Sequence, residues 1–379
     1  MRPMKKQLRG RLRKPGRVYR GTGAYKKKQT RLPKSRKSQK ARLRRRKILL
    51  VKLAASAVML FAAFLIILAV TNVVRFFMNK PTESNVAQQV TEAAVIPENT
   101  TAAAVPGITV NYPTISPSYK TIASDKVLSP YIALLDIEND SIIAGREYNQ
   151  KIYPASMTKV MTLIVAVEQI KDVNATFTMT NEILYPLVQQ NATRAGFDPG
   201  EKCSAVDMFY GLILPSGADA AAGLAQMISG TEDNFAALMN KKCQEMGLKN
   251  THFTNASGLY NDNQYTTPME MALIMEYAMK DETCAKVLST YQYTTRATEQ
   301  HPEGIPLTST MFSRMYGTEV EGVTITAGKV GYTIEAGNCL VSYAVKGDEH
   351  YVAVTGGATN KWHSIYDAFE IYRDYTLSD

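Results

Sequence analysis

Apolar residues divide the chain into one long uninterrupted run near the N-terminus and a series of shorter, periodic segments. The run, residues 53–74, reads LAASAVMLFAAFLIILAVTNVV and contains no charged residue. About 20 consecutive apolar residues are enough to cross the hydrocarbon core of a bilayer. The run is apolar on every side, which disfavours a helix of a protein core, and it exceeds the roughly 7–15 apolar residues of a signal peptide. We therefore predict a transmembrane anchor over residues 48–76.

The shorter segments predict a domain over residues 118–379 whose strands come from both of its ends. Residues 131–137 and 141–148 are strand-like and are separated by Glu138-Asn139-Asp140, a composition typical of a hairpin turn. Near the C-terminus, GVTITAGKVGYT, NCLVSYAVKG and HYVAVTGG follow one another as three further strand-like segments. Because helical segments lie between the two groups, we predict an α/β fold, an α+β sandwich in which helices flank an antiparallel sheet.

The helical segments are recognised by apolar residues spaced three or four positions apart. The first is predicted from Pro154 to about Ile170, where the apolar residues at 160, 163, 164 and 167 share one face. Further helices are predicted over residues 204–213, 218–229, 232–246, 267–280 and 361–375.

Charge is distributed unevenly, and this bears on topology. Residues 1–47 contain 22 Lys and Arg and no Asp or Glu, whereas after residue 47 the other 22 basic residues face 34 acidic ones. The basic segment has no apolar periodicity, which predicts a disordered tail. Basic residues beside an apolar span stay in the cytoplasm. The sequence therefore predicts a single-pass protein of the cytoplasmic membrane, with a cytoplasmic tail and an extracytoplasmic domain.

The segments on either side of the predicted anchor allow further interpretations. Runs of Lys and Arg attract nucleic acid, but the tail has no fold and no regular array of aromatic residues. We expect it to contact anionic lipid, and we expect no nucleic acid. Residues 77–117 are rich in Ala, Thr, Pro and Val without a sustained period, which predicts a flexible extracytoplasmic stalk.

Cysteine spacing gives no sign of a metal site. Each cysteine lies far from the others and in an apolar context, so we expect buried thiols, although disulfides are chemically allowed outside the cell. No metal and no cofactor are predicted. The four positions are Cys203, Cys243, Cys284 and Cys339.

The first of three motifs with candidate chemistry is Ser156-Met157-Thr158-Lys159. It places a hydroxyl and an amine one helical turn apart on the same face. The serine lies at a helix N-terminus, where free N–H groups favour developing negative charge. A desolvated lysine can lose its proton near neutral pH and act as a base toward the serine. Taken alone, the motif also fits a serine that simply caps the helix.

The other two motifs are Pro215-Ser216-Gly217 and Gly328-Lys329-Val330-Gly331. The first puts a serine on a tight loop between helices, where it could relay a proton into a cleft. The second puts a cation on a strand whose glycines would let a substrate backbone lie alongside. Taken alone, they also fit an ordinary turn and a glycine-kinked edge strand.

In this order, with Ser156, Ser216 and Lys329 spaced by 60 and 113 positions, the motifs resemble the signature of penicillin-binding proteins and serine β-lactamases. The surrounding segments PASMTKVMT, LILPSGADAA, FAALMNKKCQEMGLKNTHFTNASGLY, YTTPMEMA and GKVGYTIEAGNCLV closely resemble the D-alanyl-D-alanine carboxypeptidase family, the low-molecular-mass penicillin-binding proteins. The resemblance runs from about residue 118 to the C-terminus. It implies a β-lactamase/transpeptidase-like fold, a bacterial cell-wall enzyme, peptidoglycan stem peptide as substrate, and β-lactam antibiotics as acylating inhibitors.

The resemblance also implies roles for individual residues. Ser156 would attack the carbonyl between two D-alanines, Lys159 would take its proton, and Ser216 would pass a proton to the departing D-alanine. The backbone N–H groups of Ser156 and Tyr332 would form the oxyanion hole. The substrate-binding positions would be Lys329, Gly331, Tyr332 and Thr333.

Three positions depart from the family pattern. Ala218 stands where the family carries asparagine, Val330 where it carries threonine, and Gln264 where histidine is common. A hydrogen bond to a charged group contributes about 1.5–3 kcal/mol, so two interpretations stay open. One is an active carboxypeptidase with weakened or altered substrate choice. The other is a membrane-tethered relative that binds wall peptide or a partner with little turnover. A secreted β-lactamase is disfavoured, because no helix-borne glutamate that could activate a deacylating water is recognisable.

Overall fold

The computed structural model describes residues 110–376, except for residue 124 and residues 316–319. The predicted tail, the predicted anchor and most of the predicted stalk lie outside these described residues. Within the described part of the chain, no helix combines the length and the apolar character needed to cross a bilayer.

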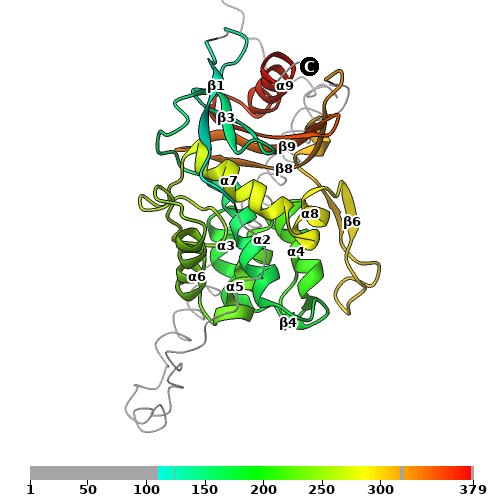
Figure 1. Ribbon diagram of the computed structural model, residues 1–379. Helices are drawn as coiled ribbons and strands as arrows, with labels where there is room; N and C mark the ends of the chain where they lie inside the picture. Colours follow the sequence, from blue (N-terminus) through cyan, green and yellow to red (C-terminus); the bar gives the residue numbers. More distant parts are fainter. Residues whose placement is uncertain (1–109, 124, 316–319, 377–379) are drawn as a thin grey trace, which may run out of the picture. The chain divides into compact units, whose positions relative to one another are not determined.

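A six-stranded sheet runs through the domain, and its strands come from both ends of the described chain (Figure 1). The strand order is β1-β3-β2-β10-β9-β8. β1 and β3 pair in parallel, and every other neighbouring pair is antiparallel. This confirms the predicted sheet built from distant segments, which is antiparallel except for the pair of β1 and β3. The strands are β1 (Thr114–Thr121), β2 (Tyr131–Asp136), β3 (Ser141–Arg146), β8 (Thr324–Thr333), β9 (Gly337–Lys346) and β10 (Glu349–Ala358).

The edge strand β1 begins at Thr114, so the sheet starts four residues before the predicted domain boundary at residue 118. Thr114 pairs with Ser141 of β3, and its N–H donates to the carbonyl of Asp140 at 2.9 Å. β1 is exposed along most of its length. An exposed edge strand needs no alternation of apolar and polar residues, which is why the pattern did not distinguish it from a stalk.

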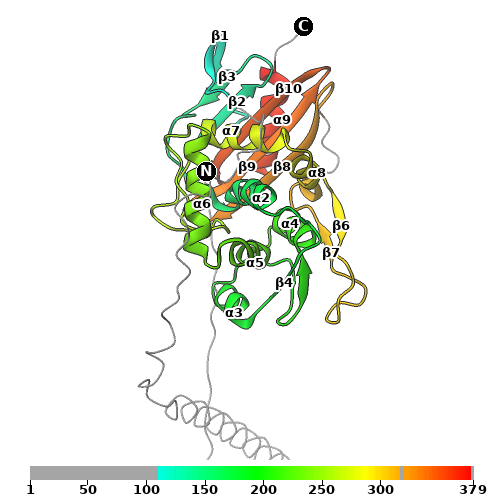
Figure 2. The same ribbon diagram turned by 60° about the horizontal axis from the view of Figure 1, so that its bottom comes forward.

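Different helices cover the two faces of the sheet (Figures 1 and 2). α9 (His363–Tyr375) packs on β9 and β10. α7 (Pro268–Met279) packs on β2, β9 and β10 from the other side, where the larger apolar cluster continues into a body of helices. That body contains η1 (Ala155–Met157), α2 (Thr158–Gln169), α3 (Asn181–Gln189), α4 (Ala205–Ile213), α5 (Ala218–Ser229), α6 (Glu232–Glu245) and α8 (Glu282–Leu288). The short elements are β4 (Thr176–Thr178), β5 (Lys202–Ser204), β6 (Gln292–Thr294), β7 (Pro306–Thr308) and η2 (Phe312–Arg314).

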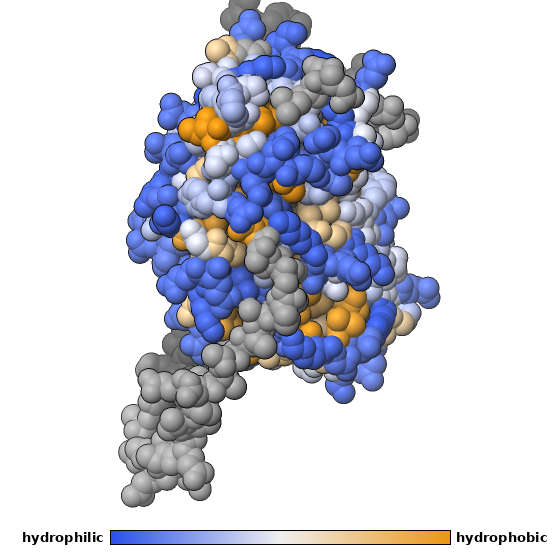
Figure 3. Space-filling model, in the orientation of Figure 1, coloured by the Kyte–Doolittle hydropathy of each residue, from blue (hydrophilic) through white to orange (hydrophobic). Residues whose placement is uncertain are grey.

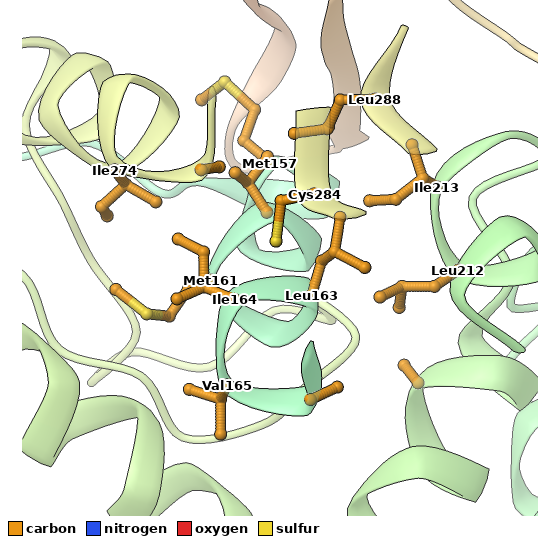
Figure 4. Close-up of a cluster of buried hydrophobic side chains, with 14 of the residues drawn as sticks. Met157, Met161, Leu163, Ile164, Val165, Leu212, Ile213, Ile274, Cys284 and Leu288 are labelled. Atoms are coloured by element: carbon orange, nitrogen blue, oxygen red, sulfur yellow. The ribbon is translucent and has the colours of Figure 1, made fainter. Parts of the chain in front are cut away.

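Helix α2 lies at the centre of the helical body. Every residue from Thr158 to Ala166 is buried, whereas the sequence predicted a single apolar face. Figure 4 shows side chains of α2, such as Leu163, surrounded by Ile213 of α4, Ile274 of α7 and Leu288 of α8. A helix enclosed on all sides must be apolar almost throughout, so its few polar groups are held in a dry environment.

The surface and the thiols complete the description. The face drawn in Figure 3 is mostly hydrophilic, with small, separate apolar patches.

All four cysteines are buried and unpaired, which confirms the expected buried thiols. Burial raises the thiol pKa of each of them, and none lies in an environment that would activate it.

Candidate active site

Ser156 lies in the single 3₁₀ turn η1, directly before α2. Its neighbours Ala155 and Met157 are buried and anchor the turn, and Ala155 adopts a positive φ of 46°. Ser156 itself is half-buried. Strand β8 passes so close that a Cβ added to Gly331 would lie 3.0 Å from the backbone N of Ser156. A side chain at 331 would therefore force the strand or the serine backbone to shift by a few tenths of an ångström.

Lys159 follows one helical turn later and is only 2% exposed. Its Nζ lies 3.2 Å from Ser156 Oγ and also donates a short hydrogen bond to the carbonyl of Ser257. Burial lowers the pKa of Lys159 to about 7, although the carboxylates of Asp219 and Glu232 act in the opposite direction. Among the described residues, no carboxylate forms an ion pair with this amine. The arrangement supplies a hydroxyl next to an amine that can be neutral near pH 7.

Ser216 lies between α4 and α5, 8% exposed, with a positive φ of 70°. The loop is closed on both sides, because Gly217 N donates to Gly211 O at 2.9 Å and Ala218 N donates to Thr193 O at 2.8 Å. Both flanking helices pack on α2. Within the described part of the chain, no hydrogen bond joins Ser216 to Lys159 or Lys329. The structure therefore places Ser216 on a strained, well-supported loop and does not bond it to the other site residues.

The carboxylate of Asp219 explains how this loop is held. Asp219 is fully buried at the start of α5. Its two oxygens accept hydrogen bonds from the backbone of the preceding connection, at 2.7 Å from Ala195 N, 2.9 Å from Gly196 N and 3.3 Å from Phe197 N. One carboxylate thus ties the start of α5, directly after the Ser216 loop, to the connection that precedes β5. The motif comparison had drawn attention to Ala218 but not to its neighbour.

Lys329 and Val330 point to opposite faces of β8. Lys329 is 1% exposed, and its Nζ donates to the carbonyl of Val330 at 2.9 Å. Burial, together with the positive charges of Lys159 and Arg314, holds the pKa of Lys329 well below its usual range. Val330 is 5% exposed and belongs to the apolar cluster that packs against α9. The lysine therefore lies on the side of the serine, and the valine side chain is part of the core on the other side.

Tyr332 and Thr333 complete the end of β8. The side chain of Tyr332 is 61% exposed. Thr333 Oγ1 accepts a hydrogen bond from Ala336 N at 3.0 Å, which closes the turn into β9. Thr333 also lines a small hollow together with Tyr153 and Gly258. Both residues thus lie at the accessible rim of the site, next to Gly331.

Three residues at the site carried no signal as site residues in the sequence. Ser257 acts through its backbone carbonyl, so its residue type gives no signal in the sequence. Glu232, the first residue of α6, accepts a hydrogen bond from Ala256 N at 3.2 Å, and burial raises its pKa. Gln264 was noted only as a departure from the family, yet it bonds to the loop that carries Ser257.

Within the described residues, one group of side chains could hold a metal ion: Asp136, Glu138 and Glu349. Asp136 ends β2 and Glu349 begins β10. The opposite ends of these strands approach the serine, since a Cβ added to Gly356 of β10 would lie 3.2 Å from Ile152. The acidic group is therefore separate from Ser156.

The match to a family model decides which family this site belongs to. Residues 118–360 match the model described as D-alanyl-D-alanine carboxypeptidase. The chain belongs to the D-alanyl-D-alanine carboxypeptidase family. This confirms the resemblance recognised in the motifs.

Individual relatives agree with the family model. The chain is 30% identical to D-alanyl-D-alanine carboxypeptidase DacF of Bacillus subtilis over 60% of this chain and 56% of the relative. It is 28% identical to DacC of Escherichia coli over 65% of this chain and 60% of the relative. The chain thus spans less than two thirds of the length of these curated relatives.

Solved structures show the same fold. The Streptomyces K15 DD-transpeptidase matches with a TM-score of 0.60 and 25% identity, over 69% of this chain and 98% of that one. Penicillin binding protein 5 of Haemophilus influenzae matches with a TM-score of 0.58 and 25% identity, over 66% and 71% of the two chains. The predicted transpeptidase-like fold is therefore confirmed.

Proposed function

We propose that this chain is a serine-type D-Ala-D-Ala carboxypeptidase that trims the terminal D-alanine from peptidoglycan stem peptides. The observation that carries the proposal is the pair formed by Ser156 and Lys159. The serine hydroxyl lies 3.2 Å from an amine whose pKa burial lowers to about 7. Family membership and the names of the relatives support the same reaction.

In the proposed reaction, the neutral Lys159 amine takes the proton of Ser156 as Oγ attacks the carbonyl carbon between the two D-alanines. The backbone N–H groups of Ser156 and Tyr332 stabilise the oxyanion. The C–N bond then breaks as Ser216 passes its proton to the nitrogen of the departing D-alanine and recovers one from the protonated Lys159, which becomes neutral again. Water attacks the carbonyl carbon of the resulting ester and gives a proton to Lys159. The ester C–O bond breaks as Lys159 returns that proton to Ser156 Oγ, and the shortened peptide leaves.

The substrate would lie along β8, at the open edge of the sheet. Lys329 lies on the side of the serine with its pKa held well below the usual range, and a bound carboxylate would favour its protonated form. Gly331 leaves room for a peptide backbone. Tyr332 and Thr333 lie at the accessible rim of the site, next to Gly331. A terminal carboxylate is favoured there, because no carboxylate of the described residues pairs with Lys329.

The test is acylation of the full chain in detergent by a fluorescent penicillin, followed by an assay of D-alanine release from a pentapeptide that ends in D-Ala-D-Ala. We expect label on the wild type, none on Ser156→Ala, and D-alanine release only by the wild type. A wild-type chain that takes up no label and releases no D-alanine would contradict the proposal.

A second candidate function is a relative that binds wall peptide or a partner and hardly turns over. The residue that favours it is Ala218, which lacks the amide found in the family; Val330 lacks the family's hydroxyl as well, but its side chain faces the α9 side of β8. Labelling without D-alanine release would indicate this function. Ala218→Asn should raise turnover if the missing hydrogen bond is limiting, whereas Val330→Thr alone should not. Because these side chains are only 3% and 5% exposed, the thermal midpoint of each variant must be measured alongside.

The N-terminal segments would tether the enzyme to the bacterial cytoplasmic membrane. Residues 48–76 would form the single span, residues 1–47 would stay in the cytoplasm, and residues 77–117 would lead to the extracytoplasmic domain. Protease treatment of spheroplasts tests this topology. We expect an N-terminal tag to remain protected while the domain is released. Protection of the domain would rule the orientation out.

A further inference from the structure

The loop Thr254–Leu259 contacts both members of the Ser156–Lys159 pair. Its Ser257 carbonyl accepts the hydrogen bond from the Lys159 amine. Its Gly258, at a positive φ of 79°, packs so tightly that an added Cβ would overlap the carbonyl of Ala155 and lie 3.0 Å from Ser156 N. A shift of this loop would therefore move a partner of each reacting group.

The side chain of Gln264 ties the two ends of this loop together. It is only 2% exposed. Its Oε1 accepts hydrogen bonds from Thr254 N at 3.0 Å and from Asn255 N at 3.1 Å, at the start of the loop. Its Nε2 donates to the carbonyl of Leu259 at 3.4 Å, at the end of the loop. It also reaches Thr158 Oγ1, one residue before Lys159, at 3.5 Å.

Other contacts hold only the middle of the loop. Thr162 Oγ1 of α2 donates to Ala256 O at 2.7 Å, and Glu232 accepts from Ala256 N at 3.2 Å. Within the loop, Asn255 Oδ1 accepts from Gly258 N at 2.7 Å. Of the described side chains outside the loop, Gln264 is the one that bonds to both of its ends.

The position of the Ser257 carbonyl matters because of the geometry of an amine. A neutral amine has two N–H groups and one lone pair in a tetrahedral arrangement. When one N–H is directed to Ser257, the rotation of the amine is restricted and the lone pair can face Ser156 Oγ. Catalytic groups misplaced by about 1 Å can lose on the order of 100-fold in rate.

We propose that Gln264 is a positioning residue for acyl transfer: it holds the loop Thr254–Leu259 closed, so that the Ser257 carbonyl orients the Lys159 amine toward Ser156. This inference rests on the proposed function, since it assigns a role in the same reaction. Gln264 touches no reacting atom and acts through the loop.

The test compares acylation rates by a fluorescent penicillin in the full chain. Gln264→Leu removes every polar contact at similar volume, whereas Gln264→His retains one donor and one acceptor. The matched control is Asn240→Ala. Asn240 exchanges two hydrogen bonds of 2.8 Å with the backbone of Phe253, one residue before the loop, and makes none to the loop itself.

We expect Gln264→Leu to lose about 10- to 100-fold in acylation rate, and Gln264→His to retain most of the wild-type rate. Asn240→Ala should lower the thermal midpoint but keep a rate close to that of the wild type. If Gln264→Leu yields too little folded protein, Gln264→Glu keeps the volume but sets an oxygen against the Leu259 carbonyl, and the same loss is expected.

Two results would overturn the inference. One is a rate for Gln264→Leu, or for Gln264→Glu in its place, within about threefold of the wild type. The other is an equal loss of rate in Asn240→Ala, which would show that general destabilisation explains the effect. A wild type that takes up no label and releases no D-alanine would instead refute the proposed function, so the two failures are distinguishable.

Discussion

Lys159 is buried with its amine 3.2 Å from Ser156 Oγ, and burial lowers its pKa to about 7. An amine accepts a proton only in its neutral form. The acylation rate should therefore rise with pH up to about pH 7 and fall roughly tenfold for each pH unit below it. Measuring the second-order rate constant with a fluorescent penicillin between pH 5 and 9 checks this expectation. A rate independent of pH across this range would show that Lys159 is not the base.

Arg314 is a second residue whose charge state matters. It follows a segment that joins both walls of the site, since Thr310 N donates to the carbonyl of Leu214 at 2.9 Å and Met311 packs against Gly328. Its charge lowers the pKa of Lys329, and no ion pair among the described residues includes it. A guanidinium stays protonated where buried amines can lose a proton. Arg314 is therefore a permanent positive charge near this site.

Replacement of Arg314 by Met should weaken acylation by a penicillin with a free carboxylate by about tenfold or more, because a hydrogen bond to a charged group contributes about 1.5–3 kcal/mol. The methyl ester of the same penicillin should react with wild type and variant at similar rates. Acylation assays with both compounds provide the measurement. An equal loss of acylation rate with the acid and with the ester would mean that Arg314 does not bind the carboxylate.

Single residues differ in how far the sequence could identify them. Ser156 and Lys159 belong to one helical turn, so their spacing alone predicts that they meet. The Ser257 carbonyl reaches the amine from almost 100 positions away and carries no side-chain signal. The resemblance puts Val330 at a position where the family carries threonine, but its side chain packs on the α9 side. The period of a strand fixes which residues share a face but not which face meets the substrate.

At the scale of elements, the turn η1 and the loop Thr254–Leu259 depend on each other through Gly258. Gly258→Ala should abolish most acylation, because the added Cβ would meet backbone atoms of Ala155 and Ser156, which cannot move aside as a flexible side chain would. The matched control is Gly247→Ala. Gly247 has a similar φ of 72°, but an added Cβ would meet nothing within 4 Å.

Both glycine variants bear the cost of a positive φ, about 1 kcal/mol, so their thermal midpoints should both fall. Only Gly258→Ala should also lose labelling by penicillin. Equal labelling of the two variants would indicate that the loop can withdraw from η1 without affecting Ser156.

Elements were predictable where their residues repeat over several turns or pleats. The strands β8 to β10 and the helices α4 to α7 were predicted from apolar segments long enough to be recognised. Their burial exceeds a single face in α4, α7, β9 and β10. α3 contains Pro186 and leaves Tyr185 and Val188 exposed, so its pattern is weak. α8 and the three-residue strands β4 to β7 are too short to show a period. Their existence depends on tertiary contacts.

At the scale of the whole molecule, the site lies between the helical body and the edge of the sheet, and it buries two lysines without a carboxylate partner among the described residues. Buried unpaired charge destabilises a fold. The core of this domain must therefore stabilise a site that is unfavourable for folding. The loss in the free energy of unfolding that these lysines cause should be measurable, and it should depend on pH.

Lys159→Met tests this cost. The folded-state pKa of about 7 lies below the ordinary lysine value of about 10.4. Between these values the unfolded chain binds the proton and the folded chain does not, so the free energy of unfolding of the wild type rises with pH, by up to about 1.4 kcal/mol per pH unit. Below about pH 7 both states are protonated, and the cost of the buried charge is present in full.

The variant has no such group, so it should be more stable than the wild type at pH 6, and the difference should shrink as the pH rises toward 9. Taking the difference between the two proteins cancels the titration of the groups that do not interact with Lys159; Lys329, whose pKa the charge of Lys159 lowers, is not among these. Thermal midpoints followed by the fluorescence of Trp362, the single tryptophan of the chain, provide the measurement. A difference that stays constant from pH 6 to pH 9 would show that Lys159 keeps its proton throughout. The base in the proposed reaction would then have to be another group.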